Sequence, residues 1–291
     1  AQRFMRLPAE KRKSFLKALK SKNLDFANLP IVPQQNSAGS TLSYAQQRQW
    51  FLWKLDSKST AYHIALGLRL RGDLNIEAFR DSIQKLVSRH DVARTHFYAN
   101  NLGLPEQRVV SELSVDVPCV DLRNIEHPEE AAEGYINDLI NKPFNLQQDP
   151  LLRVSLFRVS DSEHLMVTVM HHIVSDHWSM QIVLAEFVQQ YQAWVQGDVV
   201  SLPEMPIQYS DYAIWQRNWM EAGEQERQLS YWTGLLGNEH PVLSLPTDFF
   251  RDPEVEYKAA EYRVSFSEAL DKNLRSFARS KNMTPFMVLL T

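Results

Sequence analysis

Residues 170–179, with the sequence MHHIVSDHWS, hold three histidines, an aspartate and two serines, which are side chains that can move protons or bind metals. An apolar run at residues 164–170 leads into the two adjacent histidines, as expected for a buried strand that ends there. Imidazole has an unperturbed pKa of about 6.5 and can accept a proton from a nucleophile near neutral pH. Neighbouring side chains on a strand point to opposite faces. We therefore expect one of His171 and His172 to face a reaction centre and the other to be structural.

Three kinds of chemistry are compatible with this stretch. The least specific is a packed, hydrogen-bonded turn without catalysis. A metal site would combine His171 or His172 with Asp176 or His177. That spacing matches neither the two-histidine helical pattern of zinc proteases nor a paired-thiol site. Covalent catalysis needs an activated nucleophile, and neither serine of the stretch has the flanking glycines of a nucleophile elbow. The candidate nucleophiles are Ser175, Ser179 and Cys119.

The surrounding sequence alternates between the period of a strand and that of a helix. Strands are predicted at residues 63–70, 93–98, 108–117, 151–159, 164–170 and 260–266. Helices are predicted at residues 8–22, 76–89, 128–142, 179–196, 209–220, 224–236 and 267–281, and a further helix begins at Thr284. A strand, a polar turn and a helix therefore follow one another through the histidine stretch, which favours a ring nitrogen that projects into a cleft.

Composition limits the classes of partner. The chain has 291 residues, of which 44% are hydrophobic, enough for one large domain or two small ones. A net charge of -4 provides no basic field for nucleic acid. The one cysteine, Cys119, rules out an internal disulfide, and no apolar run is long enough to cross a membrane. We expect a soluble, cytoplasmic chain with no nucleic-acid and no membrane partner.

Four segments in a fixed order suggest a family. Residues 170–179 resemble the HHxxxDG motif that nonribosomal peptide synthetase condensation domains share with chloramphenicol acetyltransferase. Residues 43–52 (SYAQQRQWFL), 89–97 (RHDVARTHF) and 209–215 (YSDYAIW) are each similar to a condensation-domain signature. Residues 231–248 resemble the passage of such domains into their second lobe. The resemblance covers the chain from about Leu42 to Thr291.

This resemblance implies an α+β two-layer sandwich, the chloramphenicol acetyltransferase-like lobe, as the fold class. Family members pair two such lobes around a tunnel that is open at both ends. Donor and acceptor peptidyl carrier domains deliver substrates on phosphopantetheine arms, and an adenylation domain is a neighbour. The acceptor amine attacks the donor thioester to form a peptide bond. The condensation domain itself binds no cofactor and no metal.

The resemblance also implies roles for individual residues. His172 corresponds to the functional histidine of the family, as a base for the attacking amine or as a group that positions it. His171 and Asp176 support it, and Asp176 is expected to pair with Arg94 or Arg89. The alternative is that both arginines only brace the core. The first signature is closer to the subtype that joins an L-donor to an L-acceptor.

One position departs from the family pattern. His177 stands where the motif has glycine, so a bulky, titratable side chain lies beside the expected reaction centre. With Trp178 and Ser179 it is a candidate for the wall of the substrate channel, although a large aromatic residue such as Trp178 is more often part of the core. Two other functions stay open: an epimerisation domain, and a catalytically silent condensation-like module that recruits partners.

The predicted organisation has four parts. Residues 1–41 form an N-terminal helix and linker, residues 42–239 the first lobe, residues 240–258 an inter-lobe connection, and residues 259–291 the start of a truncated second lobe. A lone first lobe lacks half of its cleft, so we expect little condensation activity from this chain by itself.

Overall fold

The computed structural model describes residues 1–34, 39–200, 202–239, 242, 244, 246–250, 262 and 264–291. The chain divides into two compact units, Ala1–Asn238 and Glu239–Thr291. The first unit contains the whole histidine stretch. Most of the predicted inter-lobe connection lies outside the described residues.

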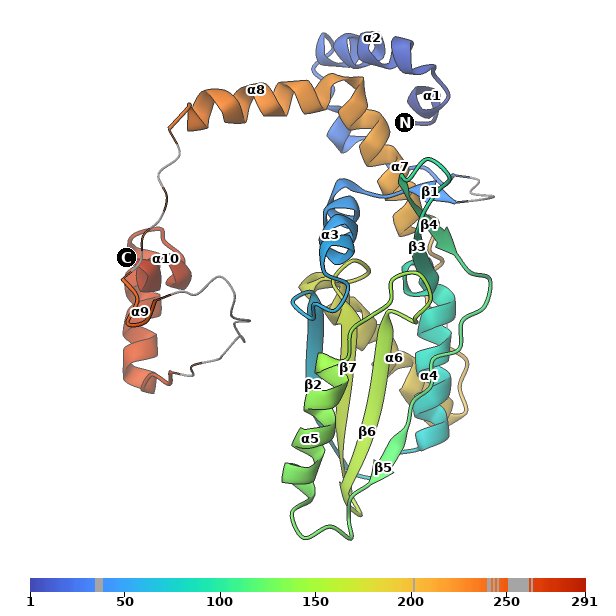
Figure 1. Cartoon of the computed structure of the whole chain (residues 1–291), viewed down its shortest axis with the longest axis vertical. Helices are drawn as coiled ribbons and strands as arrows, with labels where there is room; N and C mark the ends of the chain where they lie inside the picture. Colours follow the sequence, from blue (N-terminus) through green and yellow to red (C-terminus); the bar gives the residue numbers. More distant parts are fainter. Residues whose placement is uncertain are drawn as a thin grey trace. The chain divides into compact units, whose positions relative to one another are not determined.

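A four-stranded sheet forms the centre of the first unit (Figure 1). Its strand order is β2 (His63–Arg71), β7 (Glu163–His171), β6 (Leu152–Ser160) and β5 (Cys119–Asp121). The pairs β2–β7 and β6–β7 are antiparallel, and β5–β6 is parallel. The sequence predicted β2, β6 and β7, but not the three-residue strand β5.

The register of this sheet places even-numbered residues of three strands on one face. Met170 lies opposite Ile64 of β2 and Leu152 of β6, and Thr168 lies opposite Leu66 and Val154. Side chains alternate along a strand, so odd-numbered residues such as His171 face the other way.

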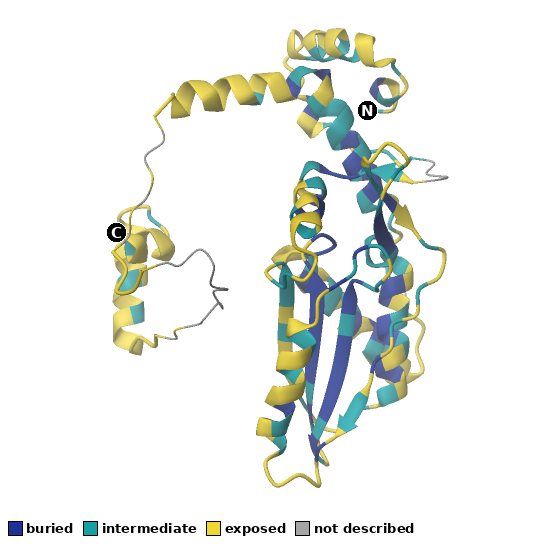
Figure 2. Cartoon of the chain, in the orientation of Figure 1, coloured by how far each residue is buried: buried dark blue, intermediate teal, exposed yellow. Residues whose placement is uncertain are grey.

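Helices cover both faces of the sheet. The helices α4 (Ile76–Arg89) and α6 (His177–Gln196) pack against each other on the even-numbered face. The helix α5 (Pro128–Asn141) lies on the odd-numbered face, where the rings of Tyr135 and Phe157 stack with their centroids 6.0 Å apart. The central strands are therefore buried along most of their length (Figure 2).

A second, three-stranded sheet has the order β1 (Ser40–Thr41), β4 (Pro105–Val109) and β3 (Thr95–Ala99). The predicted strand at 93–98 begins later than expected because Asp91–Arg94 form the 3-10 turn η2. Before β2 runs the helix α3 (Tyr44–Leu55), which the sequence did not predict. A capping box starts α3: Ser43 Oγ accepts from the backbone N–H of Gln46, and Gln46 Oε1 accepts from the N–H of Ser43.

The prediction of a strand at 108–117 is wrong beyond Val109. Carbonyls of this extended segment bond to side chains of α4 and of η2 instead of a partner strand. Arg94 donates to the carbonyls of Val110 and Ser111, Gln84 to that of Leu113, and Arg80 to that of Val117. Because side chains satisfy these backbone carbonyls, the segment does not need hydrogen bonds from a neighbouring strand.

The N-terminal residues pack against the helical segments between residues 209 and 224. The segments α1 (Gln2–Met5), α2 (Ala9–Lys20) and η1 (Phe26–Asn28) contact α7 (Tyr209–Trp219), the π-turn η3 (Met220–Glu224) or both. The helix α8 (Gln225–Leu236) continues from η3. At the centre of this cluster Phe26 stacks on Trp215, with ring centroids 5.8 Å apart.

In the second unit, the described residues form the helices α9 (Glu268–Ser280) and α10 (Pro285–Leu290), as predicted. Ser267 Oγ and Thr284 Oγ1 cap them by accepting backbone N–H groups. The predicted strand 260–266 lies partly outside the described residues, and Tyr262 and residues 264–266 are not in a strand.

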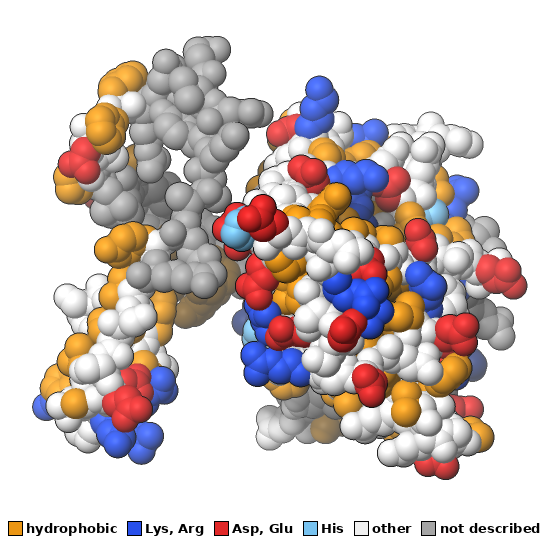
Figure 3. Space-filling model, turned by 90° about the horizontal axis from the view of Figure 1, so that it is seen from below, with side chains coloured by type: hydrophobic (Ala, Val, Ile, Leu, Met, Phe, Trp, Pro, Cys, Tyr) orange, Lys and Arg blue, Asp and Glu red, His pale blue; other side chains and the backbone are white. Residues whose placement is uncertain are grey.

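Acidic and basic side chains are interspersed on the molecular face shown in Figure 3, in keeping with the small net charge. Across the described part of the chain, no helix combines the length and the apolar character that crossing a bilayer requires.

Candidate active site

The two adjacent histidines lie on opposite faces at the end of β7. His171 is the last residue of the strand and is 3% exposed. His172 follows it, and its backbone N–H donates to the carbonyl of Tyr62 at 2.8 Å, which extends the pairing with the β2 side by one residue. Its side chain is exposed and lines a cavity on the even-numbered face of the sheet. The alternation of side chains thus separates two identical residues into different environments.

His171 lies in an apolar, aromatic setting. Its ring is 6.1 Å from that of His63 and 6.1 Å from that of Phe144, centroid to centroid. Its Nδ1 accepts a hydrogen bond from the backbone N–H of Ile173 at 3.0 Å. Burial, reinforced by neighbouring histidines, lowers the pKa of His171 from 6.5 to about 3. His171 is therefore neutral near pH 7 and orients the turn after the strand.

Asp176 caps the helix that follows. Its Oδ1 accepts hydrogen bonds from the backbone N–H of Ser179 at 2.7 Å and from Ser179 Oγ at 2.6 Å. These hydrogen bonds lower the pKa of the carboxyl group, and the charge suits the positive end of α6. Asp176 thus fixes where α6 begins and how the turn from His172 enters it.

The expected partnership of Asp176 with an arginine is wrong, because each arginine has another carboxylate. Arg94 contacts Asp91 at 2.6 Å, and Arg89 contacts Glu186 of α6 at 3.2 Å. His90 Nε2 lies 2.7 Å from the same carboxylate of Glu186. A buried carboxylate needs such partners, but Asp176 is exposed and obtains its hydrogen bonds from Ser179.

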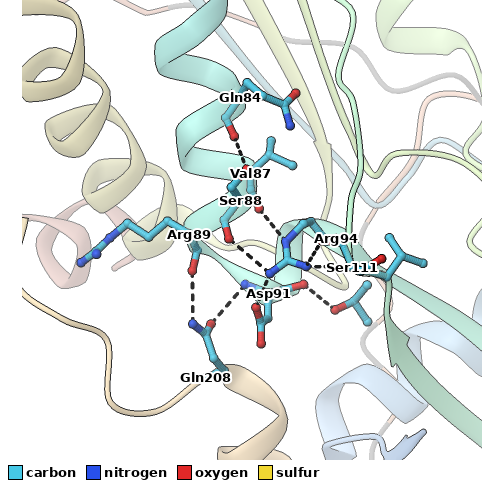
Figure 4. A network of polar contacts seen from close by, with 10 residues as sticks. Gln84, Val87, Ser88, Arg89, Asp91, Arg94, Ser111 and Gln208 are labelled. Carbon is cyan, nitrogen blue, oxygen red and sulfur yellow. Dashed lines mark hydrogen bonds and ion pairs between the residues drawn. The ribbon is translucent and has the colours of Figure 1, made fainter. Parts of the chain in front are cut away.

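Arg94 joins the end of α4 to the chain beyond β4 (Figure 4). Its guanidinium donates to the carbonyls of Val87 and Ser88 in the last turn of α4, and to those of Val110 and Ser111. Beside it, Gln208 bonds to both the carbonyl of Arg89 and the N–H of Asp91. Arg94 braces the structure and does not reach the cavity, whose lining excludes it.

The cavity holds about 550 Å³ and lies between the sheet and the helices α4 and α6. Its floor is apolar and comes from the even-numbered face, with Leu66, Met166 and Met170. Its polar lining includes His172, Asp176, Ser179, His90, Glu186, Arg48, Gln49 and Tyr209. A concave apolar site with a few converging polar groups is the usual form of a small-molecule site.

Of the three predicted channel residues, the structure brings only Ser179 to this cavity. Trp178 is 73% exposed on the first turn of α6, so the expectation that it packs in the core is wrong. His177 is exposed, and its Nε2 accepts a hydrogen bond from Gln181 Nε2 at 3.0 Å. Neither Trp178 nor His177 lines the cavity.

The helix α3 also contributes residues to the cavity. Gln49 Nε2 donates to the carbonyl of His172 at 3.2 Å, and Arg48 also lines the cavity. Ser43 Oγ lies 3.1 Å from Tyr209 Oη of α7. The capping box at Ser43 was the available signal for this helix, but no pattern indicated which of its residues face the cavity.

The arrangement suits proton transfer to or from a small molecule bound in the cavity. His172 offers a ring nitrogen to a site with an apolar floor, and the turn that carries it is held by Tyr62, Gln49 and His171. Among the residues that the structure describes, no three histidine, cysteine, aspartate or glutamate side chains come together as metal ligands would.

Comparisons with known proteins agree with this geometry. A family model described as "Condensation domain" matches residues 37–291. A linear gramicidin synthase protein of Brevibacillus parabrevis is 38% identical over 268 residues, which are 90% of this chain and 3% of that protein. Malpinin synthetase of Mortierella alpina is 33% identical over 263 residues, 90% of this chain and 3% of that protein. The chain thus spans a small part of these relatives.

Solved structures share the fold. The starter condensation domain of rhizomide synthetase RzmA matches with a TM-score of 0.64 at 21% identity, over 70% of this chain and 49% of that one. The X-domain solved in complex with OxyB from teicoplanin biosynthesis matches with a TM-score of 0.68 at 24% identity, over 77% and 49%. The predicted chloramphenicol acetyltransferase-like fold is confirmed. With its histidine turn, its cavity and a family match over most of its length, the chain belongs to the condensation domain family of nonribosomal peptide synthetases.

Proposed function

We propose that this chain contributes the first lobe and the reactive histidine of a site that joins an L-configured donor to an L-configured acceptor by a peptide bond. Both substrates are thioesters on the phosphopantetheine arms of carrier domains, and an adenylation domain is a neighbour in the same cytoplasmic assembly. Residues 42–239 form the first lobe, residues 240–258 the connection, and residues 259–291 the start of the second lobe.

The observation that carries this proposal is the separation of the two histidines. His171 is buried and neutral, whereas His172 is exposed at the cavity and anchored through its backbone. A ring held in this way can accept a hydrogen bond from an amine and take its proton as the amine attacks the thioester carbonyl. The nitrogen loses a proton, and the departing sulfur gains one.

The test uses the protein that carries this chain, with loaded donor and acceptor carriers. We expect His172→Ala to lower the single-turnover rate of product formation roughly 100- to 10,000-fold, the usual contribution of general acid–base catalysis. His177→Gly is the matched control, because that ring lies outside the cavity lining, and it is expected to retain activity.

Unchanged product formation in His172→Ala would remove the catalytic assignment. Exchange of the substrate α-hydrogen with solvent, without a new amide bond, would favour an epimerisation domain. Carrier binding by the parent protein without any chemistry would favour a recruiting module.

A further inference from the structure

A short segment before α7 reaches the cavity at one residue. Residues 203–208 (PEMPIQ), the 203–208 segment, lie outside any helix or strand, and only Met205 among them lines the cavity. Glu204 and Pro206 on either side of it are exposed, whereas Met205 is partly buried. A residue before proline favours extended backbone, in which neighbouring side chains point to opposite sides. The side chain of Met205 is therefore directed toward the cavity and those of its neighbours toward solvent.

The first end of the 203–208 segment is attached to the last residue of α4. Arg89 Nη2 donates to the carbonyl of Pro203 at 2.6 Å. The same guanidinium contacts the carboxylate of Glu186 on α6 at 3.2 Å. Glu186 and His90, the residue after Arg89, both line the cavity. The segment therefore begins beside the wall of the cavity that α4 and α6 form.

The second end of the segment is attached at two places. The side chain of Gln208 donates to the carbonyl of Arg89 and accepts from the N–H of Asp91 (Figure 4). The next residue, Tyr209, lines the cavity, and its Oη lies 3.1 Å from Ser43 Oγ at the start of α3. Other residues of α3 line the cavity as well. The segment thus leads from the wall formed by α4 and α6 to the wall formed by α3, with Met205 between its attached ends.

The backbone of the segment is restricted, whereas the side chain of Met205 is not. Pro203 and Pro206 fix their own φ angles and limit the residues before them. Methionine is unbranched, with three rotatable side-chain bonds and a polarizable sulfur, so it adapts to apolar groups of different shape. Met205 is not one of the side chains that pack against the hydrophobic core of the first unit. Its size can therefore be changed without leaving a hole in that core.

We propose that Met205 contacts the apolar side chain of a bound substrate and limits the size of side chain that the cavity accepts. This inference rests on the proposed function. The cavity floor of Leu66, Met166 and Met170 is apolar, so burial of an apolar side chain there is favourable. No bond is formed or broken at Met205. Its effect is on the choice between substrates and not on the proton transfer assigned to His172.

The proposal predicts a change in substrate choice, measured as the ratio of single-turnover rates with a phenylalanyl and an alanyl substrate. In Met205→Trp the larger side chain fills part of the cavity, so we expect this ratio to fall about 10-fold, which is within the discrimination that apolar pockets achieve by size. In Met205→Ala the ratio should rise, because more space is open to the larger substrate.

Two series of measurements identify which substrate provides the side chain. Both use the protein that carries this chain, with loaded carriers. The first varies the donor with an alanyl acceptor, and the second varies the acceptor with an alanyl donor. We expect the ratio to change in one series only, since a single side chain contacts Met205.

Matched variants separate this role from damage to the fold. Val199 lies in the same connection between α6 and α7, is 94% exposed and does not line the cavity. Val199→Trp and Val199→Ala are therefore expected to keep the ratio of the parent protein. Met205→Leu keeps the apolar character and approximate size of the side chain, and it should also stay close to the parent. Thermal unfolding of each variant reports changes in stability.

An unchanged ratio in both series for folded Met205→Trp and Met205→Ala would overturn the role of Met205 while leaving that of His172 intact. Equal changes in both series, or the same change in Val199→Trp, would also contradict it. Full activity in His172→Ala, or a parent protein that forms no product, would instead overturn the proposed function. If Met205→Trp unfolds, Met205→Ala decides, because an unchanged ratio in that variant contradicts the proposal by itself.

Discussion

His171 and His172 have the same side chain and opposite surroundings. The difference follows from the period of a strand, which turns one ring toward Phe144 and the other toward the cavity. Burial excludes the charged form of His171 near pH 7, whereas the exposed ring of His172 lies where a substrate in the cavity can contact it. Consecutive residues thus supply a buried, neutral support and an exposed ring at the cavity.

The state of His171 predicts how stability depends on pH. Unfolded His171 binds a proton near pH 6.5, whereas the folded residue does so only near pH 3. Between these values the unfolded state holds more protons, so the free energy of unfolding falls as pH falls. From pH 6.5 to 5 the expected loss is roughly 2 kcal/mol. Replacing His171 by Asn, which keeps an acceptor for the N–H of Ile173, should flatten this slope in urea denaturation.

His63, whose pKa is also lowered by burial, retains its contribution in this variant, so part of the slope should persist. His177→Asn, which changes an exposed ring, is the control. Its free energy of unfolding should depend on pH as steeply as that of the parent protein. A His171→Asn protein with the full parental slope would contradict the buried, neutral state of His171.

At the scale of elements, Arg94 donates hydrogen bonds to carbonyls at the C-terminal end of α4. Its guanidinium reaches the carbonyls of two α4 residues, those of the segment after β4, and Asp91 (Figure 4). Lysine has a single ammonium group and cannot donate to all of these oxygens at once, as the planar guanidinium does. We expect Arg94→Lys to lower the free energy of unfolding by about 2–3 kcal/mol, measured by urea denaturation.

Arg71→Lys is the matched control, since Arg71 is largely exposed and bonds to Glu163 at the surface. Its effect should stay below about 0.5 kcal/mol. Similar stabilities of the two variants would show that the Arg94 network contributes little.

Elements with a clear period were predictable, and the others were not. The helix α4 buries one stripe, which includes Phe79, Ile83 and Leu86, and its predicted bounds agree with the structure. The helix α3 buries Gln46 and Gln49 and has no such stripe, so the apolar pattern failed there. Residues 108–117 were wrongly predicted as a strand because their composition is that of a strand. In the structure, arginine and glutamine side chains donate hydrogen bonds to the backbone carbonyls of the segment beyond Val109 in place of a partner strand.

The candidate site was predictable where it depends on strand geometry. Alternation predicted that His171 and His172 would differ in role, and their surroundings do differ. The partner of Asp176 was not predictable, because an aspartate before a helix can cap it or pair with a distant arginine, and only tertiary structure decides. Gln49 was missed for the same reason, since its partner lies 123 residues away.

At the scale of the molecule, the N-terminal residues are part of the packed first unit. Phe26 is 3% exposed and contacts Phe4 and Trp215. Phe26→Ala removes a buried ring, a change that costs about 3–5 kcal/mol in a well-packed core. We expect faster proteolytic cleavage within residues 1–34 of this variant under native conditions, measured by mass spectrometry of the fragments.

Leu24→Ala is the control, because Leu24 is 49% exposed two residues earlier, and it should be cleaved at the rate of the parent protein. Equal cleavage rates for Phe26→Ala and the parent would show that local unfolding of the N-terminal segment does not depend on the packing of Phe26 against Phe4 and Trp215.

The hydrogen bonds that join α3 to distant parts of the chain also matter for protein engineering. Gln49 meets His172 across 123 residues, and Ser43 meets Tyr209 across 166. A chimera whose crossover falls between these partners combines side chains that were selected in different parents. Placing the crossover after Asn238 keeps both pairs within one parent, so libraries of hybrid synthetases built at that boundary should retain more folded members.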